Sequence, residues 1–143
     1  MMTKVLYTAE SQAKGGGRDG QSATLDGALS VTLAPPTALG GSGKGNNPEQ
    51  LFAVGYAACY LGAIRYAASQ DKTLPAVPAD ATVNATVGIG PRDDGGFGLT
   101  IGLKVNLPGV EKEAAARLVQ AGHHICPYSN ALKAGLPVET VIV

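Results

Sequence analysis

Residues 48–68 read PEQLFAVGYAACYLGAIRYAA, and this stretch decides the fold. It is apolar on nearly every side and carries only two charged residues, Glu49 and Arg65. Asn47 is a suitable N-cap, Pro48 suits the first helical position, and Glu49 favours the positive end of a helix. The stretch therefore predicts one helix over residues 48–68 that is buried on most of its faces.

Apolar and polar residues alternate on both sides of this helix, which is typical of strands. The predicted elements around it are strands over residues 4–13, 21–34, 81–90 and 97–107, a helix over 110–125 and a last strand over 136–143. This order of strands and helices predicts an α+β fold. The length of the chain predicts a single domain, residues 1–143.

The charge of the chain is balanced, with 11 acidic and 11 basic side chains among 143 residues. Such a chain has no strong field to recruit nucleic acid or an anionic membrane, and we expect neither as a partner. There is no tryptophan, and only 5% of the residues are aromatic. Because this gives a light core, we expect apolar surface to be buried between subunits.

The N-terminus lacks the apolar run and the small-residue cleavage site of a secretory signal. The longest apolar stretch, Leu51 to Ile64, is shorter than a bilayer requires. We therefore expect a cytoplasmic protein. In that compartment its two cysteines, Cys59 and Cys126, are more typical of catalysis or metal binding than of a permanent disulfide.

Cys59 lies inside the predicted helix, where a cysteine is most often a small apolar residue. Burial raises the pKa of a thiol and so disfavours the reactive thiolate. The N-terminus of its own helix does not help, because Cys59 lies well past the first turn. A nucleophilic Cys59 therefore needs a nearby cation. The candidates in the sequence are Arg18, Lys44, Arg65 and Arg92.

Cys126 lies in the sequence HHICPYSNA, residues 123–131, at the end of the second predicted helix. His123 and Cys126 are three residues apart and, with Cys59, are ligand types that zinc accepts. The spacing is a weak indication of a metal, because a paired Cys-x-x-Cys is missing. The favoured interpretation is that His123 and His124 are surface or capping residues at a helix C-terminus, without a metal.

Two longer motifs resemble the signatures of the OsmC/Ohr family. They are NPEQLFAVGYAAC at residues 47–59 and CPYSNA at residues 126–131. The turn GRDG at residues 17–20 is similar to the arginine site of the family. The resemblance covers essentially the whole chain. It is closest to the organic hydroperoxide resistance (Ohr) branch, although LKAGL at residues 132–136 is more similar to the OsmC branch.

The resemblance implies an OsmC-like fold, with antiparallel sheets around a long buried helix, in an intertwined homodimer. It implies a cysteine peroxidase of the oxidative-stress response that reduces organic hydroperoxides to alcohols without a cofactor. Cys59 matches the peroxidatic cysteine and Cys126 the resolving cysteine, which together form a disulfide. Arg18 matches the arginine that stabilises the thiolate, and Glu49 the carboxylate that orients it. The expected reductant is a dithiol, such as the dihydrolipoyl group of a carrier protein.

The aromatic residues Phe52, Tyr56 and Tyr60 surround Cys59 on the predicted helix. They suit the apolar tail of an organic peroxide. They are equally typical of core aromatics, and the sequence leaves both interpretations open.

Glu49 and Cys59 are ten residues apart, which is about 15 Å along a straight helix. One arginine hardly reaches both residues of one helix over that distance. Either the helix breaks near Gly55, or the helices of two chains run antiparallel and bring one chain's Glu49 to the other's Cys59. The small residues Gly55 and Gly62 favour the second interpretation, which predicts a site at a dimer interface.

A stress protein that binds a small molecule or a metal without turnover is the main alternative function. The joint presence of two cysteines with Arg18 and Glu49 argues against it, since binding alone needs no attacking and resolving thiol. A peroxide sensor would need an output domain, for which 143 residues leave no room.

Overall fold

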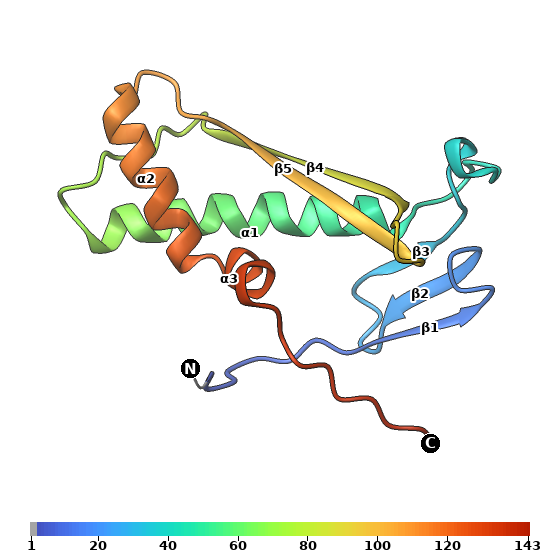
Figure 1. Ribbon diagram of the computed structural model, residues 1–143. Helices are drawn as coiled ribbons and strands as arrows, with labels where there is room; N and C mark the ends of the chain where they lie inside the picture. The colour runs from blue at the N-terminus through green and yellow to red at the C-terminus, as the bar shows by residue number, and fades with distance from the viewer. Residues whose placement is uncertain (1–2) are drawn as a thin grey trace. The chain divides into compact units, whose positions relative to one another are not determined.

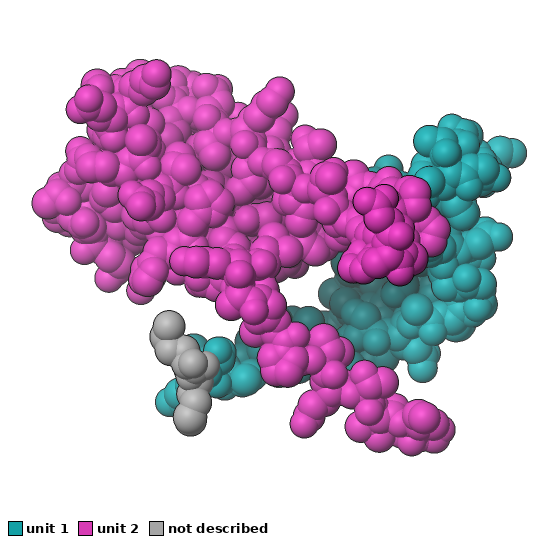
Figure 2. Space-filling model, viewed as in Figure 1, with its two compact units in different colours: residues 1–51 teal, residues 52–143 magenta. Residues whose placement is uncertain are grey.

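The computed structural model describes residues 3–143 (Figure 1). Helices and antiparallel sheets are both present, which confirms the predicted α+β class. The chain divides into two compact units, residues 1–51 and residues 52–143 (Figure 2). Helix α1 (Pro48–Gln70) begins at the end of the first unit, and most of its length belongs to the second. The single domain over residues 1–143 stays a prediction.

The first unit contains a three-stranded antiparallel sheet. Its strands are, in spatial order, β1 (Ser11–Gly15), β2 (Gly20–Thr24) and β3 (Ser30–Thr32). Between β1 and β2 the chain reverses through a turn in which Gly17 has a φ of 70°, a conformation that glycine adopts without steric cost. The N–H of Gly20 closes this turn by donating to the Gly17 carbonyl at 3.1 Å. The turn presents Arg18.

The strand predictions for the first unit are only partly right. Residues 4–10 are not in a strand, so the predicted strand over 4–13 is wrong for most of its length. The predicted strand over 21–34 is two strands, because a turn separates β2 from β3. In that turn Asp26 Oδ1 accepts a hydrogen bond from the N–H of Ala28 at 2.9 Å, and Gly27 has a φ of 74°. The Asp-Gly pair was the signal for this turn.

Side chains in the first turn fix the start of α1. Asn47 Oδ1 accepts a hydrogen bond from the N–H of Gln50 at 2.8 Å. Gln50 Oε1 in return accepts one from the N–H of Asn47 at 3.1 Å. This reciprocal pair is a capping box, which satisfies backbone donors that the helix itself leaves free. The predicted start is therefore confirmed, and the helix extends two residues beyond the predicted end at 68, to Gln70.

Within the chain itself, α1 is most deeply buried on one side, and burial of its remaining faces stays a prediction. Neighbouring elements of the second unit cover only one side of the helix. The buried side consists of Tyr56, Tyr60, Ala63, Ile64 and Ala67. An exposed stripe at four-residue spacing consists of Val54, Ala58, Gly62 and Tyr66.

By length and composition alone, α1 is also long and apolar enough to cross a membrane. The apolar run of residues 51–64 is shorter than the helix that contains it, which has 23 residues, and the cytoplasmic location stays a prediction. Core helices satisfy the same criterion, so this is a weak indication of a membrane span.

In the second unit a long antiparallel hairpin lies along α1 (Figure 1). Its strands are β4 (Thr82–Pro91) and β5 (Phe97–Asn106), which confirms the two predicted strands. The register pairs Val83 with Val105, and alternate side chains share a face. That face packs against a core cluster formed by Tyr56, Tyr60, Ala63, Ile64, Leu118 and Cys126.

Two helices follow the hairpin. Helix α2 (Lys112–Ile125) confirms the second predicted helix, and the carboxylate of Glu111 caps it by accepting from two backbone N–H groups. Helix α3 (Pro127–Ala134) was not predicted, although Pro127 occupies its first turn, where proline is favoured. The predicted last strand is wrong, because the structure assigns no strand to residues 136–143.

Helix α2 packs closely against α1 at Gly122. A Cβ atom at this position would lie 2.4 Å from Ile64 Cγ2 and 3.2 Å from the hydroxyl of Tyr60. Protein interiors are too densely packed to absorb such an overlap without a shift of the surrounding atoms. Gly122 therefore sets the distance between the two helices.

We expect Gly122→Ala to lower the free energy of unfolding by about 1–3 kcal/mol through overpacking. Helix propensity alone would make this change stabilising, because alanine is favoured over glycine in a helix interior by about 1 kcal/mol. A loss of stability would therefore report the overpacking. Urea denaturation measures the change. Ala116→Gly, on the exposed side of α2, is the matched control that reports helix propensity alone. A Gly122→Ala protein as stable as the wild type would show that this contact does not limit helix packing.

Candidate functional site

The sulfur atoms of Cys59 and Cys126 are 3.6 Å apart. Both cysteines are free. Cys59 is partly buried in the middle of α1, whereas Cys126 is fully buried at the corner between α2 and α3. A disulfide bond measures about 2.05 Å, so the sulfurs need to approach by about 1.5 Å to form one. The fold thus brings together two thiols that are distant in the sequence.

The surroundings of Cys59 raise the pKa of its thiol, mainly through burial, which removes solvent from the thiolate. The backbone N–H of Tyr128 favours the thiolate and lowers the pKa of Cys59, opposing burial. The neighbouring thiol of Cys126 raises it again. Burial dominates within the second unit, so an activated Cys59 needs a cation.

Sequence reasoning missed the contribution of Tyr128. The expectation that no helix terminus assists Cys59 considered only α1, but the first turn of α3 directs an N–H group at the sulfur. The N-terminus of a helix carries partial positive charge, which favours a thiolate. The signal was the pair Cys126-Pro127, since proline is favoured in the first turn of a helix.

Arg18 and Glu49 form a bidentate ion pair in the first unit. Arg18 Nη2 donates to Glu49 Oε1 at 2.6 Å, and Nη1 donates to Oε2 at 3.1 Å. These hydrogen bonds hold the pKa of Glu49 below its ordinary value. Two parallel hydrogen bonds also fix the plane of the guanidinium. The structure thus places the predicted arginine and carboxylate together, and their roles in catalysis stay predictions.

Helix α1 is unbroken across Gly55, so the alternative of a break there is wrong. Gly55 is explained by the second unit itself, because a Cβ atom there would lie 2.8 Å from the hydroxyl of Tyr128. At Gly62, by contrast, an added Cβ would meet nothing within 4 Å. Of the two glycines, only Gly62 leaves space open on the surface of the chain.

The three predicted substrate-binding aromatics differ in burial. The Tyr60 hydroxyl donates to the Val119 carbonyl at 2.7 Å, and burial raises the pKa of Tyr60 to about 12, so it remains a protonated donor. Tyr56 is also a core residue. Phe52 is partly buried, and its ring meets that of Tyr128 edge to face, with centroids 5.8 Å apart. Contact of all three with substrate stays a prediction.

The remaining candidate cations are engaged elsewhere or exposed. Arg65 donates to the Pro78 carbonyl at 3.0 Å, Arg92 pairs with Asp94, and Lys44 is exposed in the first unit. Among residues 3–143, no three His, Cys, Asp or Glu side chains lie close enough to hold a metal ion. His123 instead forms a hydrogen bond through Nδ1 with Ser129 Oγ at 2.9 Å.

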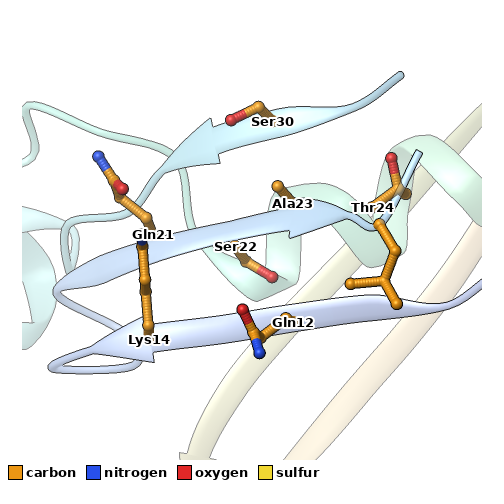
Figure 3. A pocket seen from close by; sticks show the side chains of 8 residues that line it. Gln12, Lys14, Gln21, Ser22, Ala23, Thr24 and Ser30 are labelled. Atoms are coloured by element: carbon orange, nitrogen blue, oxygen red, sulfur yellow. The ribbon is translucent and has the colours of Figure 1, made fainter. Parts of the chain in front are cut away.

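A polar pocket of about 320 Å³ lies on the sheet of the first unit (Figure 3). None of the predicted site residues lines it, and its side chains include no nucleophilic thiol. Its lining residues are Gln12, Lys14, Gln21, Ser22, Ala23, Thr24, Leu25 and Ser30. The cysteine pair is therefore the better candidate for chemistry.

Comparison with known proteins identifies relatives over nearly the whole chain. A sequence model of the OsmC-like protein family matches residues 41–141. An organic hydroperoxide resistance protein of Xanthomonas axonopodis pv. citri is 46% identical over 140 residues, which cover 97% of this chain and 96% of that protein.

Solved structures give the same result. A crystal structure of an organic hydroperoxide resistance protein from Legionella pneumophila superposes with a TM-score of 0.84 at 41% identity, covering 92% of this chain and 93% of the other. That of the organic hydroperoxide resistance protein OhrB of Bacillus subtilis gives a TM-score of 0.77 at 38% identity, covering 91% and 93%. These neighbours confirm the predicted OsmC-like fold of the chain.

We expect Arg18→Ala to return the pKa of Glu49 towards its ordinary value, because the hydrogen bonds that lower it are lost. A group whose folded pKa is depressed contributes stability above its unfolded pKa, and this contribution is lost as pH falls through the folded pKa. The Arg18 side chain is 46% exposed, so the contribution at neutral pH is about 1 kcal/mol or less.

NMR titration of the Glu49 carboxyl, with urea denaturation at about pH 7 and about pH 2.5, tests this pair. The destabilisation by Arg18→Ala should be present at neutral pH and absent in acid. Arg65→Ala is the control for loss of an arginine without a carboxylate partner. An unshifted Glu49 titration in Arg18→Ala would show that the ion pair does not persist in solution.

Proposed function

The chain belongs to the OsmC-like protein family, and on that premise we propose that it is a thiol-dependent peroxidase that reduces organic hydroperoxides to alcohols. The single observation that carries this proposal is the pair of free thiols 3.6 Å apart. A second thiol beside a peroxidatic cysteine traps its sulfenic acid as a disulfide before further oxidation. Relatives that are organic hydroperoxide resistance proteins support a role in peroxide stress.

In the proposed reaction the Cys59 thiolate attacks the terminal oxygen of the hydroperoxide. The O–O bond breaks, the alkoxide leaves and takes up a proton to become the alcohol, and Cys59 becomes a sulfenic acid. Cys126 then attacks the Cys59 sulfur, forming the disulfide, and its proton leaves with the hydroxyl as water. An external dithiol reduces this disulfide and is itself oxidised to a disulfide.

The assignment of the two thiols follows from their accessibility. Cys59 is partly exposed, whereas Cys126 has no exposed surface. A peroxide can reach only a sulfur that is accessible, so Cys59 is the proposed attacking thiol. Phe52 is the aromatic most available to contact the apolar part of the substrate, with Tyr56 and Tyr60 behind it in the core.

Arg18, oriented by Glu49, is the proposed cation for the Cys59 thiolate. A guanidinium keeps its charge at any relevant pH and can therefore stabilise a desolvated anion. On an unbroken helix Glu49 and Cys59 of one chain are about 15 Å apart. We therefore propose that Arg18 and Glu49 of one chain serve Cys59 of a second copy.

Exposed apolar surface supports a homodimer. The exposed stripe of α1 includes Val54, which is 71% exposed. The extended C-terminal segment adds Leu136, Val138 and Ile142, which are 71%, 85% and 98% exposed. Apolar surface of this extent is typical of an interface rather than of a free monomer. An intertwined dimer would cover it.

We also propose a cytoplasmic location and a dithiol reductant, such as the dihydrolipoyl group of a carrier protein. The balanced charge of the chain supports the absence of nucleic acid and of the membrane as partners. A physiological role in the response to oxidative stress follows from the proposed activity.

Cys59→Ser is expected to abolish reduction of cumene hydroperoxide, because the attacking sulfur is lost. Cys126→Ser should still consume about one equivalent of peroxide per chain and then stop or overoxidise, because nothing resolves the sulfenic acid. Peroxide consumption and thiol titration measure both effects. In the wild type, stoichiometric peroxide should remove two thiols per chain. Equal residual turnover in the two variants would contradict the assigned roles.

The shared site predicts complementation between two inactive variants. In a mixed dimer of Cys59→Ser with Glu49→Ala, one site contains neither lesion and the other contains both. At equal and random mixing, activity should return to about one quarter of the wild-type value. The measurement is peroxidase activity after subunit exchange, with the exchange followed by mass spectrometry. No recovery despite complete exchange would exclude the shared site but not the peroxidase.

A further inference from the structure

Ser129 lies at the centre of a hydrogen-bond chain that joins three helices. Its Oγ atom is 2.7 Å from the hydroxyl of Tyr56 on α1 and 2.9 Å from Nδ1 of His123 on α2. Ser129 and Tyr56 are buried, and His123 reaches them from the surface with Nδ1 turned inward. A hydroxyl has one hydrogen but two lone pairs, so Ser129 can satisfy both partners at once.

The hydrogen bonds of Ser129 lie around the corner between α2 and α3 that carries Cys126. This residue ends α2 and caps α3, with φ of −66° and ψ of 119°, and its side chain makes no capping hydrogen bond. His123 lies three residues before Cys126 and Ser129 three residues after it. The hydrogen bond between them therefore ties α2 to α3 across the corner. Tyr56 adds a tie to α1, one turn before Cys59.

The His123 ring has a second contact, so that its packing and its hydrogen bond can be tested separately. It lies against the ring of Tyr60, with centroids 4.7 Å apart. Tyr60 is itself fixed by its hydrogen bond to the Val119 carbonyl. A side chain of similar bulk without a nitrogen can therefore keep the packing against Tyr60 while losing the bond to Ser129.

We propose that His123 is a positioning residue for formation of the Cys59–Cys126 disulfide, acting through Ser129 on the corner that carries Cys126. This inference rests on the proposed peroxidase function. The sulfurs need to approach by about 1.5 Å for bond formation. A corner held by hydrogen bonds on both sides keeps Cys126 near the attacking position, which raises the rate of the intramolecular step.

The proposed effect is confined to one step of the reaction. In that step the Cys126 sulfur attacks the Cys59 sulfur, the S–O bond of the sulfenic acid breaks, and the hydroxyl leaves as water with the proton from Cys126. In the proposed step His123 contacts neither sulfur. The preceding attack of Cys59 on the peroxide uses the corner only through the backbone N–H of Tyr128, which lowers the Cys59 pKa, so its rate should depend on His123 much less than the disulfide step does.

The experiment compares the two steps in His123→Leu, which keeps bulk against Tyr60 but removes Nδ1. The reduced protein is mixed with one equivalent of cumene hydroperoxide, and dimedone traps the sulfenic acid over time. Mass spectrometry then quantifies the adduct, the disulfide and the sulfinic acid. Loss of the Cys59 thiol should proceed within about twofold of the wild-type rate, while disulfide formation slows by about five- to tenfold, as for one lost hydrogen bond.

Three further variants sharpen the test. Ser129→Ala should reproduce the slow disulfide step, since it removes the atom through which His123 acts. His123→Asn places a polar atom near the position of Nδ1 and should restore much of the rate. His124→Leu, at the adjacent exposed histidine, should leave both steps unchanged. Thermal denaturation of each variant confirms folding before kinetics are compared.

The outcomes separate this inference from the function on which it rests. A wild-type protein that does not form the sulfenic acid or the disulfide with peroxide would overturn the peroxidase itself. A wild type that reacts, with His123→Leu resolving at the same rate, would overturn only the role of His123. Equal slowing of both steps in His123→Leu would also overturn it, because that result indicates a general structural defect.

Discussion

The closeness of the two sulfurs depends on how tightly α2 packs against α1, and one residue without a side chain sets that distance. Gly122 meets Ile64 and Tyr60 at a separation that leaves no room for a Cβ atom. Its carbonyl also accepts the N–H of Cys126 at 2.8 Å, so the same residue fixes the helix spacing and the end of α2. The same contact lies within the core cluster that contains Cys126.

The charged and titratable groups that the proposed function uses lie in both units of the chain. In the second unit burial disfavours the Cys59 thiolate, and a single backbone N–H from Tyr128 opposes it. In the first unit Arg18 is held by Glu49 in a fixed plane. A buried anion without a compensating charge is strongly disfavoured. The proposed function therefore requires that the arginine of one unit reach the sulfur of the other, in a second copy of the chain.

Local sequence patterns were sufficient to predict the start of α1 and the β4–β5 hairpin, because neighbouring residues determine these features. The capping box of Asn47 and Gln50 and the alternation of the β4–β5 hairpin need no distant partner. The residues of the thiol pair and the ion pair were identified by their resemblance to a family. Their geometry was beyond the sequence, because it depends on contacts between helices.

Two of the errors have their physical origin in non-local contacts. The pattern of residues 136–143 suits a strand, but a strand also needs a neighbour with free backbone groups, and this segment is paired with no strand in the described residues 3–143. The apolar stripe at Val54 and Gly62 is likewise exposed because no other part of the described chain packs against it. The role of α3 was missed because an eight-residue helix gives little periodic signal, and because its effect is on a cysteine of another helix.

Full burial of Cys126 gives the catalytic cycle proposed for this chain a direction. Once the disulfide has formed, an incoming thiol can touch only the Cys59 sulfur, so Cys126 is always the leaving group. The oxidant and the reductant then both react at the accessible side of the Cys59 sulfur, so they must bind there one after the other. Such an enzyme shows ping-pong kinetics, and an excess of either substrate delays the other. The shape of the opening that leads to the Cys59 sulfur, rather than redox potential alone, then determines which thiols can act as electron donors.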